Sequence, residues 1–298
     1  MGLKMVRLKY DMTILKKEDV DFPWRLKGLP DCPDIIFALG NIKILNNFSI
    51  AVVGSRLCNE YGIRVTNKIV EDLTNRGICI VSGLAEGIDT YAHRAAIRNN
   101  GKTIAVIGNG FENIYPYGNA KLVNEIIEKG GAIISEYFPD QAPLSFCFPH
   151  RNRLVACMTE GTLVTQARED SGALITANLA MKYGKKVFAV PGDITDKKCF
   201  GSNRIINCGA KLVRDVNDIL AEYSCYNFPI ISNNQQTEIK VPDEKYNEIY
   251  KTLESGPMHI NEICKKTDKS IQMVLSDLTM LEMQGFIEIL PGEYYKIV

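Results

Sequence analysis

Six short apolar runs, separated by amphipathic stretches, constrain this chain of 298 residues more than any other feature of its sequence. Each run is continuous and rich in β-branched residues; their sequences, from Ser49 onward, are SIAVVG, ICIVSG, KTIAVIG, GAIIS, TLVT and KVFAVPG. A run of this kind is typical of a strand buried on both faces. Strands that alternate with helices form βα units, so we expect an α/β protein with a mostly parallel, doubly wound sheet.

The remaining elements follow from the same pattern. Helices fit between the strands at residues 61–75, 90–99, 119–129 and 172–183, and residues 209–213 fit a last edge strand. Prolines interrupt residues 1–48, which we interpret as an N-terminal segment packed on the core with one short helix at residues 35–39. The sheet domain is then expected over residues 49–220, followed by a polar linker over residues 221–242 that contains SNNQQTE.

The last 56 residues predict a second, smaller domain. Residues 243–298 read as three helices followed by a two-stranded hairpin, which is the arrangement of a winged helix. This segment holds six lysines and ten acidic residues, a net charge of −4, and its third helix, at residues 271–284, has no Lys or Arg. Duplex DNA binding requires cations that neutralise phosphates, so we favour a protein-docking role for this domain.

Composition narrows the class of protein and its compartment. The chain carries 35 basic and 35 acidic residues, so any site for a polyanion must be local. Nine cysteines without CxxC spacing indicate reduced thiols and a cytoplasmic location rather than a disulfide framework or a zinc site. No apolar run reaches the roughly 18 residues of a membrane span, and the first twelve residues lack the apolar core of a signal peptide, so we expect no membrane insertion.

Glycine-rich loops follow several of the predicted strands. Ligands of a doubly wound sheet collect beyond the carboxyl ends of its strands, where loops meet helix N-termini. Gly54-Ser55-Arg56 follows the first predicted strand, and a loop containing Gly83 follows the second. Such residues can line a phosphate-binding crevice, although glycines are also needed simply to make tight βα turns.

The densest polar cluster is Phe146-Cys147-Phe148-Pro149-His150-Arg151-Asn152-Arg153. Bases stack on aromatic rings while guanidinium groups hold phosphates, so this mixture suits single-stranded nucleic acid better than duplex. The alternative is structural: Phe148 would be part of the core, and the arginines would pair with acids such as Glu136 or Asp140.

Known catalytic and cofactor motifs are not found in the sequence. GNGFEN departs from the dinucleotide fingerprint, and Gly101-Lys102-Thr103 runs into a strand rather than a helix as a P-loop would. Asp89 and His93 stand four residues apart, but we favour Asp89 as a helix cap and His93 as a partner of a loop carbonyl. We therefore expect no catalytic residues, no metal site and no cofactor.

Several motifs, in order along the chain, resemble the DNA-processing protein A (DprA/Smf) family. They are AVVGSR, SGLAEGID with AH following, TIAVIGNG, YPYGN, SEY, FPHRNR, SGALITANLA, VFAVPG and GSNRII. The resemblance spans roughly residues 20–220, and the acidic winged helix is similar to one that many members carry. It implies an extended Rossmann-like domain, a homodimer, no established catalytic activity, and a single-stranded-DNA-binding recombination mediator that loads the recombinase RecA during natural transformation.

The resemblance also assigns candidate DNA-binding residues. Arg56 would contact phosphate in a loop shaped by Gly54 and Ser55, Gly83 would let the second loop close beneath the strand, and Phe148 would lie near the DNA. The rim would comprise Arg151, Asn152 and Arg153, the last with a possible structural role. Two departures predict weaker binding: residues 144–147 have no basic or histidine side chain, and Tyr117 stands where a lysine is frequent, which leaves Lys121 as the nearest cation.

Two rival functions remain open at the level of sequence. One is a Rossmann-like nucleotide-processing enzyme related to the nucleoside monophosphate phosphoribohydrolases, although the PGGxGT motif of that family is not in the chain. The other is a scaffold whose winged helix docks a partner and whose crevice has no ligand.

Overall fold

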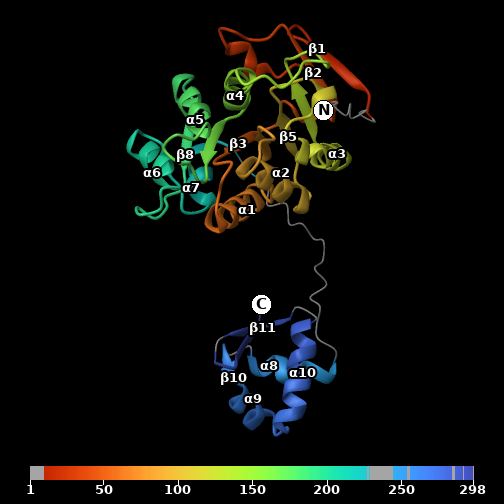
Figure 1. The fold of residues 1–298 in the computed structure, drawn as a ribbon, viewed down its shortest axis with the longest axis vertical. Coiled ribbons are helices and arrows are strands. Elements are labelled where there is room, and N and C mark those ends of the chain that lie inside the picture. Colours follow the sequence, from red (N-terminus) through yellow and green to blue (C-terminus); the bar gives the residue numbers. More distant parts are fainter. Residues whose placement is uncertain are drawn as a thin grey trace. The chain divides into compact units, whose positions relative to one another are not determined.

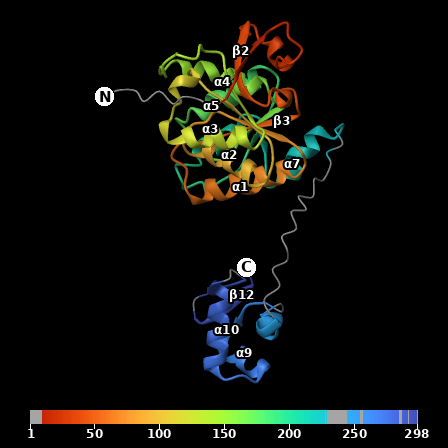
Figure 2. The same ribbon diagram turned by 90° about the vertical axis from the view of Figure 1, so that its right-hand side faces the viewer.

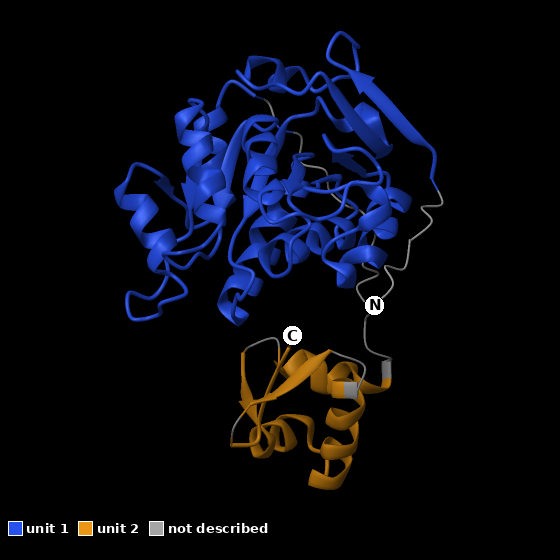
Figure 3. Cartoon of the chain, turned by 45° about the horizontal axis from the view of Figure 1, so that its top comes forward, with its two compact units in different colours: residues 1–233 blue, residues 234–298 orange. Residues whose placement is uncertain are grey.

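The computed structural model describes residues 10–226, 228, 244–253, 256–283, 286–290 and 292–297. Its contacts divide the chain into two compact units, residues 1–233 and residues 234–298 (Figure 3). Most of the linker predicted at residues 221–242 lies outside the described residues, which reach Tyr226 and Phe228.

Unit 1 is built on a nine-stranded sheet in the order β1-β2-β6-β5-β4-β3-β7-β8-β9. The strands are β1 Met12–Lys16, β2 Ile35–Gly40, β3 Ser49–Val53, β4 Cys79–Ser82, β5 Thr103–Val106, β6 Ala132–Ser135, β7 Gly161–Val164, β8 Lys186–Ala189 and β9 Lys211–Leu212. All pairs from β6 to β9 are parallel. The predicted parallel sheet and its edge strand are confirmed, and the fold is extended Rossmann-like.

Helices cover both faces of this sheet (Figure 1). The helices are α1 Glu60–Thr74, α2 Ile88–Arg98, α3 Ala120–Glu128, α4 Cys147–Cys157, α5 Ala173–Lys182, α6 Phe200–Asn207 and α7 Val216–Leu220. Helices α1, α2 and α3 lie side by side on one face (Figure 2), while α4 and α5 pack on the other. The strands between them are buried on both sides because the sequence supplies apolar residues at consecutive positions.

The N-terminal segment contributes two strands to the sheet, which corrects one prediction. Residues 35–39 form strand β2 rather than a helix, and β2 pairs antiparallel with both β1 and β6. Its central four residues are buried. A short apolar run does not itself distinguish a buried strand from a buried helix, and here pairing with two neighbouring strands decides the outcome.

Unit 2 is a winged helix, as predicted. It comprises α8 Asn247–Leu253, α9 Ile260–Thr267 and α10 Ile271–Met283, followed by the antiparallel pair β11 Ile287–Leu290 and β12 Tyr294–Ile297. A two-residue strand, β10 Met258–His259, completes a three-stranded sheet. The helices and strands enclose a core of their own.

Two further observations concern membrane spans and the cysteines. Within the described ranges, no helix is both long and apolar enough to cross a membrane. All nine cysteines are free thiols.

Candidate nucleic-acid interface

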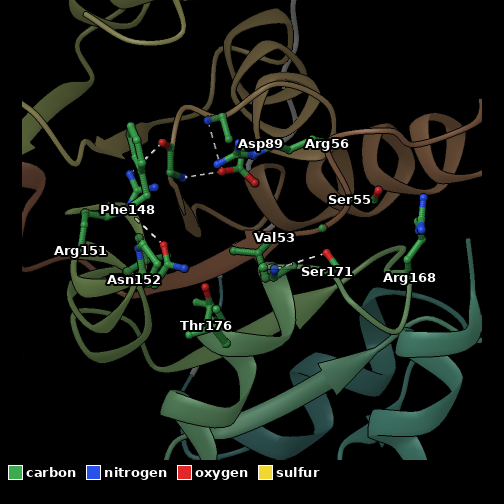
Figure 4. A pocket seen from close by; sticks show the side chains of 18 of the residues that line it. Val53, Ser55, Arg56, Asp89, Phe148, Arg151, Asn152, Arg168, Ser171 and Thr176 are labelled. Carbon is green, nitrogen blue, oxygen red and sulfur yellow. Dashed lines mark hydrogen bonds between the residues drawn. The ribbon is translucent and has the colours of Figure 1, made fainter. Parts of the chain in front are cut away.

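The sheet has a topological switch point at β3, because the next strand along the chain, β4, lies on one side of it and β7 lies on the other. Connections leave in opposite directions at such a point, and a crevice opens beyond the carboxyl ends of the strands. A cavity of about 560 Å³ lies there, lined by the loops after β3, β4 and β7 and by helices α4 and α5 (Figure 4).

The loop after β3 presents Arg56 to this cavity. The Ser55 amide donates to the Gln166 carbonyl at 2.8 Å, and the Ser55 hydroxyl accepts from the Leu57 amide at 3.1 Å. Gly54 is packed so closely that a Cβ there would lie 2.8 Å from the Gln166 carbonyl oxygen. Ser55 is therefore buried and shapes the loop, while the Arg56 side chain is exposed.

Two buried charged residues, Asp89 and Arg151, form hydrogen bonds with the loop after β4. Asp89 accepts hydrogen bonds from the amides of Gly83 at 3.1 Å and Ala85 at 3.3 Å. Arg151 donates from Nη1 to the Gly83 carbonyl at 2.8 Å and to the Val106 carbonyl. A Cβ on Gly83 would lie 2.7 Å from Arg151 Nη2 and 2.8 Å from Asp89 Oδ2, so a larger residue at this position would displace these buried groups.

Two predictions about the start of α2 are wrong. Asp89 does not cap the helix, because α2 begins at Ile88 and Asp89 lies in its first turn, where it binds the preceding loop. His93 does not bind a loop carbonyl: its Nδ1 lies 2.8 Å from the Thr103 hydroxyl. No cluster of metal-ligating side chains occurs in the part of the chain that the structure describes.

Burial shifts the pKa values of three side chains beneath the cavity, His93, Arg151 and Asp89. It lowers the pKa of His93 to about 3, with the positive charge of Arg151 acting in the same direction, so this imidazole is neutral at physiological pH. Burial also lowers the pKa of Arg151 to about 10, which leaves the guanidinium protonated. For Asp89, burial raises the pKa, while Arg151 and the amides of Ala85 and Gly83 oppose the shift.

The Phe148–Arg153 cluster lies on a helix, α4, that the sequence did not predict. Phe148 and Asn152 are partly exposed and line the cavity, and the Phe148 ring contacts the Tyr115 ring at 5.4 Å between centroids. Arg151 is only 4% exposed, so it lies under the cavity wall rather than on a rim.

Arg153 has a structural position. It donates to Glu136 from Nη1 and Nη2 at 2.7 Å each, and from Nε to Asp31 at 2.6 Å. These pairs join α4 to the segment after β6 and to the N-terminal segment. The alternative interpretation, in which an arginine of this cluster pairs with Glu136, is confirmed for Arg153, whose second acidic partner is Asp31 rather than Asp140.

Seven of the nine candidate residues therefore line one cavity: Gly54, Ser55, Arg56, Gly83, Phe148, Arg151 and Asn152. Lys121, exposed on α3, and Arg153 do not line it. Sequence reasoning missed the cavity residues Tyr115, Arg168 and Thr176. The position of Arg168 after the β7 strand was the available signal, but its use required knowing that β7 lies beside β3.

The partners of the other charged cavity residues leave the Arg56 guanidinium available to contact a ligand. Arg168 is paired with Asp170, at 3.1 Å between Nε and Oδ1, and Arg151 is engaged by the strand ends. Asp89 is hydrogen-bonded to the loop amides. Of the cavity cations, Arg56 alone has no ion pair or hydrogen bond with another described residue.

Two family models match this chain. Residues 13–224 match the model of the family described as DNA recombination-mediator protein A, and residues 235–293 match the DprA winged helix domain. The chain belongs to the DprA/Smf family. Among its relatives, the DNA processing protein DprA of Streptococcus pneumoniae is 45% identical over 202 residues, covering 68% of this chain and 71% of the relative. Protein Smf of Escherichia coli is 35% identical over 283 residues, covering 93% and 75%.

Solved DprA structures share the fold of this chain. DNA processing protein A from Streptococcus pneumoniae superposes with a TM-score of 0.67 at 42% identity, covering 74% of this chain and 76% of that one. DNA processing protein A from Helicobacter pylori, described for its single-stranded DNA binding mode, gives a TM-score of 0.65 at 29% identity and covers 74% and 99%. This DprA-family chain thus has a recombination-mediator fold with a crevice at its switch point.

Proposed function

We propose that this DprA-family protein binds single-stranded DNA in the crevice and, as a homodimer, loads the recombinase RecA on that strand. The observation that carries the proposal is the convergence of an available cation, Arg56, with the contacting rings of Phe148 and Tyr115 at one cavity. Rings stack with unpaired bases, and guanidinium groups hold phosphates. The Helicobacter pylori relative described for single-stranded DNA binding supports the same ligand class.

Single strands suit this cavity better than duplex because the base faces must be free to reach the rings. In a duplex, those faces are stacked on neighbouring base pairs, and only groove edges and phosphates are accessible. A protein with no net charge gains little from bulk attraction to a polyanion, so its affinity must come from a few local contacts.

Binding without catalysis is favoured over the nucleotide-processing alternative. Of the two carboxylates that line the cavity, Asp89 is buried and holds the loop amides, and Asp170 is paired with Arg168. Neither is a free general base or nucleophile. Incubation with nucleoside monophosphates tests the alternative: release of free base would support it, and unchanged substrate is expected.

The decisive experiment is a titration of labelled single-stranded and duplex DNA at several salt concentrations, with wild type and Arg56→Ala. We expect Arg56→Ala to weaken single-strand binding and to reduce the slope of log K against log salt by about 0.7, the contribution of one phosphate contact to a single strand. The matched control is Arg98→Ala, because Arg98 is an exposed arginine at the far end of α2, where that helix has returned to the opposite edge of the sheet. Duplex binding as tight as single-strand binding, or an unchanged slope, would contradict the proposal.

The partner and assembly claims need separate measurements. Sedimentation velocity tests the homodimer, and filament assembly on single-stranded DNA coated with a single-strand-binding protein tests RecA loading. We expect faster filament growth in the presence of the protein and none of that acceleration with Arg56→Ala. We place the protein in the cytoplasm, which is consistent with its nine free thiols.

A further inference from the structure

Three aromatic rings form a continuous series that starts in the cavity and leads out of it. The Phe148 and Tyr115 rings are 5.4 Å apart at an interplanar angle of 40°, and the Tyr115 and Tyr117 rings are 6.2 Å apart at 78°. Phe148 and Tyr115 line the cavity, whereas Tyr117 lies beyond it, in the 3-10 turn Tyr117–Asn119. The series therefore extends past the crevice described above.

The two tyrosines are not needed to pack the loop that carries them. Along this loop, Ile114 and Pro116 are buried, while Tyr115 is 39% and Tyr117 57% exposed. The alternation places the apolar packing on one side and both tyrosine rings on the other. Among the described residues, neither tyrosine hydroxyl has a hydrogen-bond partner, so ring contacts are what hold these side chains.

The loop is fixed in place by buried amides. Asn119 is 5% exposed and donates from Nδ2 to the Leu84 carbonyl at 2.9 Å and to the Thr90 hydroxyl at 2.8 Å. Asn109, fully buried, donates from Nδ2 to the Asn113 carbonyl at 2.8 Å. The loop is thereby tied to the loop after β4, to helix α2 and to the residues just after β5, and rings that are held before binding lose little conformational entropy when a ligand stacks on them.

We propose that Phe148, Tyr115 and Tyr117 form a base-stacking path along which single-stranded nucleic acid leaves the crevice. The inference rests on the proposed function, since it names the route of the same ligand. The ring planes are turned by 40° and 78° relative to one another, so bases that stay stacked in parallel cannot lie on all three rings, and a strand must separate its bases to follow the series. The path thus selects single strands by geometry.

The path adds affinity for the nucleic acid through stacking on the rings rather than through contacts between cations and phosphates. Residues 111–120, which contain both tyrosines, include no Lys or Arg; the next cation, the exposed Lys121, does not line the cavity. Contacts made there release no condensed counterions, in contrast to the phosphate contact expected at Arg56. Loss of a ring should consequently weaken binding by the same factor at every salt concentration.

The test compares Tyr117→Ala and Tyr117→Phe in the full chain, with fluorescein-labelled oligothymidylates of about 4 and about 16 nucleotides, the span of single-strand site sizes. We expect Tyr117→Ala to weaken binding of the longer oligonucleotide by about fivefold or more, with an unchanged salt slope. The shorter one, which the crevice can hold, should bind as to wild type, and Tyr117→Phe should retain binding because it keeps the ring.

The matched control is Tyr226→Ala. Tyr226 is 48% exposed and contacts Phe48, the residue before β3, so it lies at the opposite edge of the sheet. Equal binding of the longer oligonucleotide by wild type and Tyr117→Ala would overturn the path while leaving the crevice intact. So would a loss of affinity accompanied by a reduced salt slope, or an equal loss in Tyr117→Phe. Failure of the wild type to bind any oligothymidylate would instead remove the proposed function.

Discussion

Replacement of Arg151 separates a structural role from a DNA-contacting one. The resemblance places this arginine on the rim of the DNA site, yet in the structure it is 4% exposed and ties the ends of two strands together through Gly83 and Val106. The substitution Arg151→Met keeps an unbranched apolar chain of similar length but removes the guanidinium. We expect a large loss of stability in unit 1.

The magnitude follows from the groups left behind. Two backbone carbonyls lose a charged donor, and the buried Asp89 loses the positive charge that opposes its desolvation. Removing one partner from such a buried arrangement costs about 3–5 kcal/mol, a large fraction of the 5–15 kcal/mol that typically stabilises a domain. A purely surface arginine would cost within about 0.5 kcal/mol.

The loss should also depend on pH. Burial raises the pKa of Asp89 in the folded state, and removal of Arg151 raises it further. An acid with a raised folded pKa favours folding most when it is protonated, and this advantage is lost as the pH rises through that folded pKa. The difference in unfolding free energy between wild type and Arg151→Met should therefore be smallest near pH 4 and should grow towards neutral pH.

Urea unfolding followed by tryptophan fluorescence measures both effects, because the single tryptophan, Trp24, lies in unit 1. With m near 3 kcal/mol/M, we expect the midpoint to fall by about 1 M or more at neutral pH. Adding Asp89→Asn to Arg151→Met should recover part of the loss and remove its pH dependence. A midpoint equal to that of wild type, or an Arg151→Met variant whose only defect is in DNA binding, would refute the reasoning.

Three further substitutions test neighbouring parts of the account. Gly83→Ala should lower stability by about 1–3 kcal/mol in the same urea assay, because its Cβ would lie under 3 Å from two buried charged groups. Arg153→Ala should cost about 1.5–3 kcal/mol, since it breaks charged hydrogen bonds to the partly buried Glu136, but should leave the salt slope of DNA binding unchanged. Glu86→Gln should tighten single-strand binding a few-fold in fluorescence anisotropy, because this exposed carboxylate lines a second, small pocket that Arg56 also lines; weaker binding would contradict it.

The central sheet could be predicted from the sequence because its strands are continuous apolar runs, which local reading detects. The N-terminal strands could not. The run at residues 35–39 is too short to show a helical or a strand period, and one of its partner strands, β6, lies far from it along the chain. Pairing with β1 and β6 in the folded sheet is what makes residues 35–39 a strand.

The loops of the candidate site, with Arg56, were predictable from the sequence, but the positions of Arg151 and Arg153 were not. Glycine loops after strands mark the crevice regardless of strand order, so Arg56 was found. Arg151 and Arg153 are two residues apart, and on a helix such side chains point to nearly opposite sides. The sequence offered pairing with Glu136 only as an alternative for either arginine; without helix α4 in the prediction, it could not show which arginine lies beneath the cavity and which pairs with Glu136.

Photocrosslinking of the protein to a thymine-containing single strand, with the attachment sites mapped by mass spectrometry, tests the central claim most directly. Adducts on Phe148 and Tyr115 are predicted, and they should diminish when Arg56 is replaced by alanine. Adducts confined to α10 of the winged helix, or spread over surfaces away from the switch point of the sheet, would contradict the account.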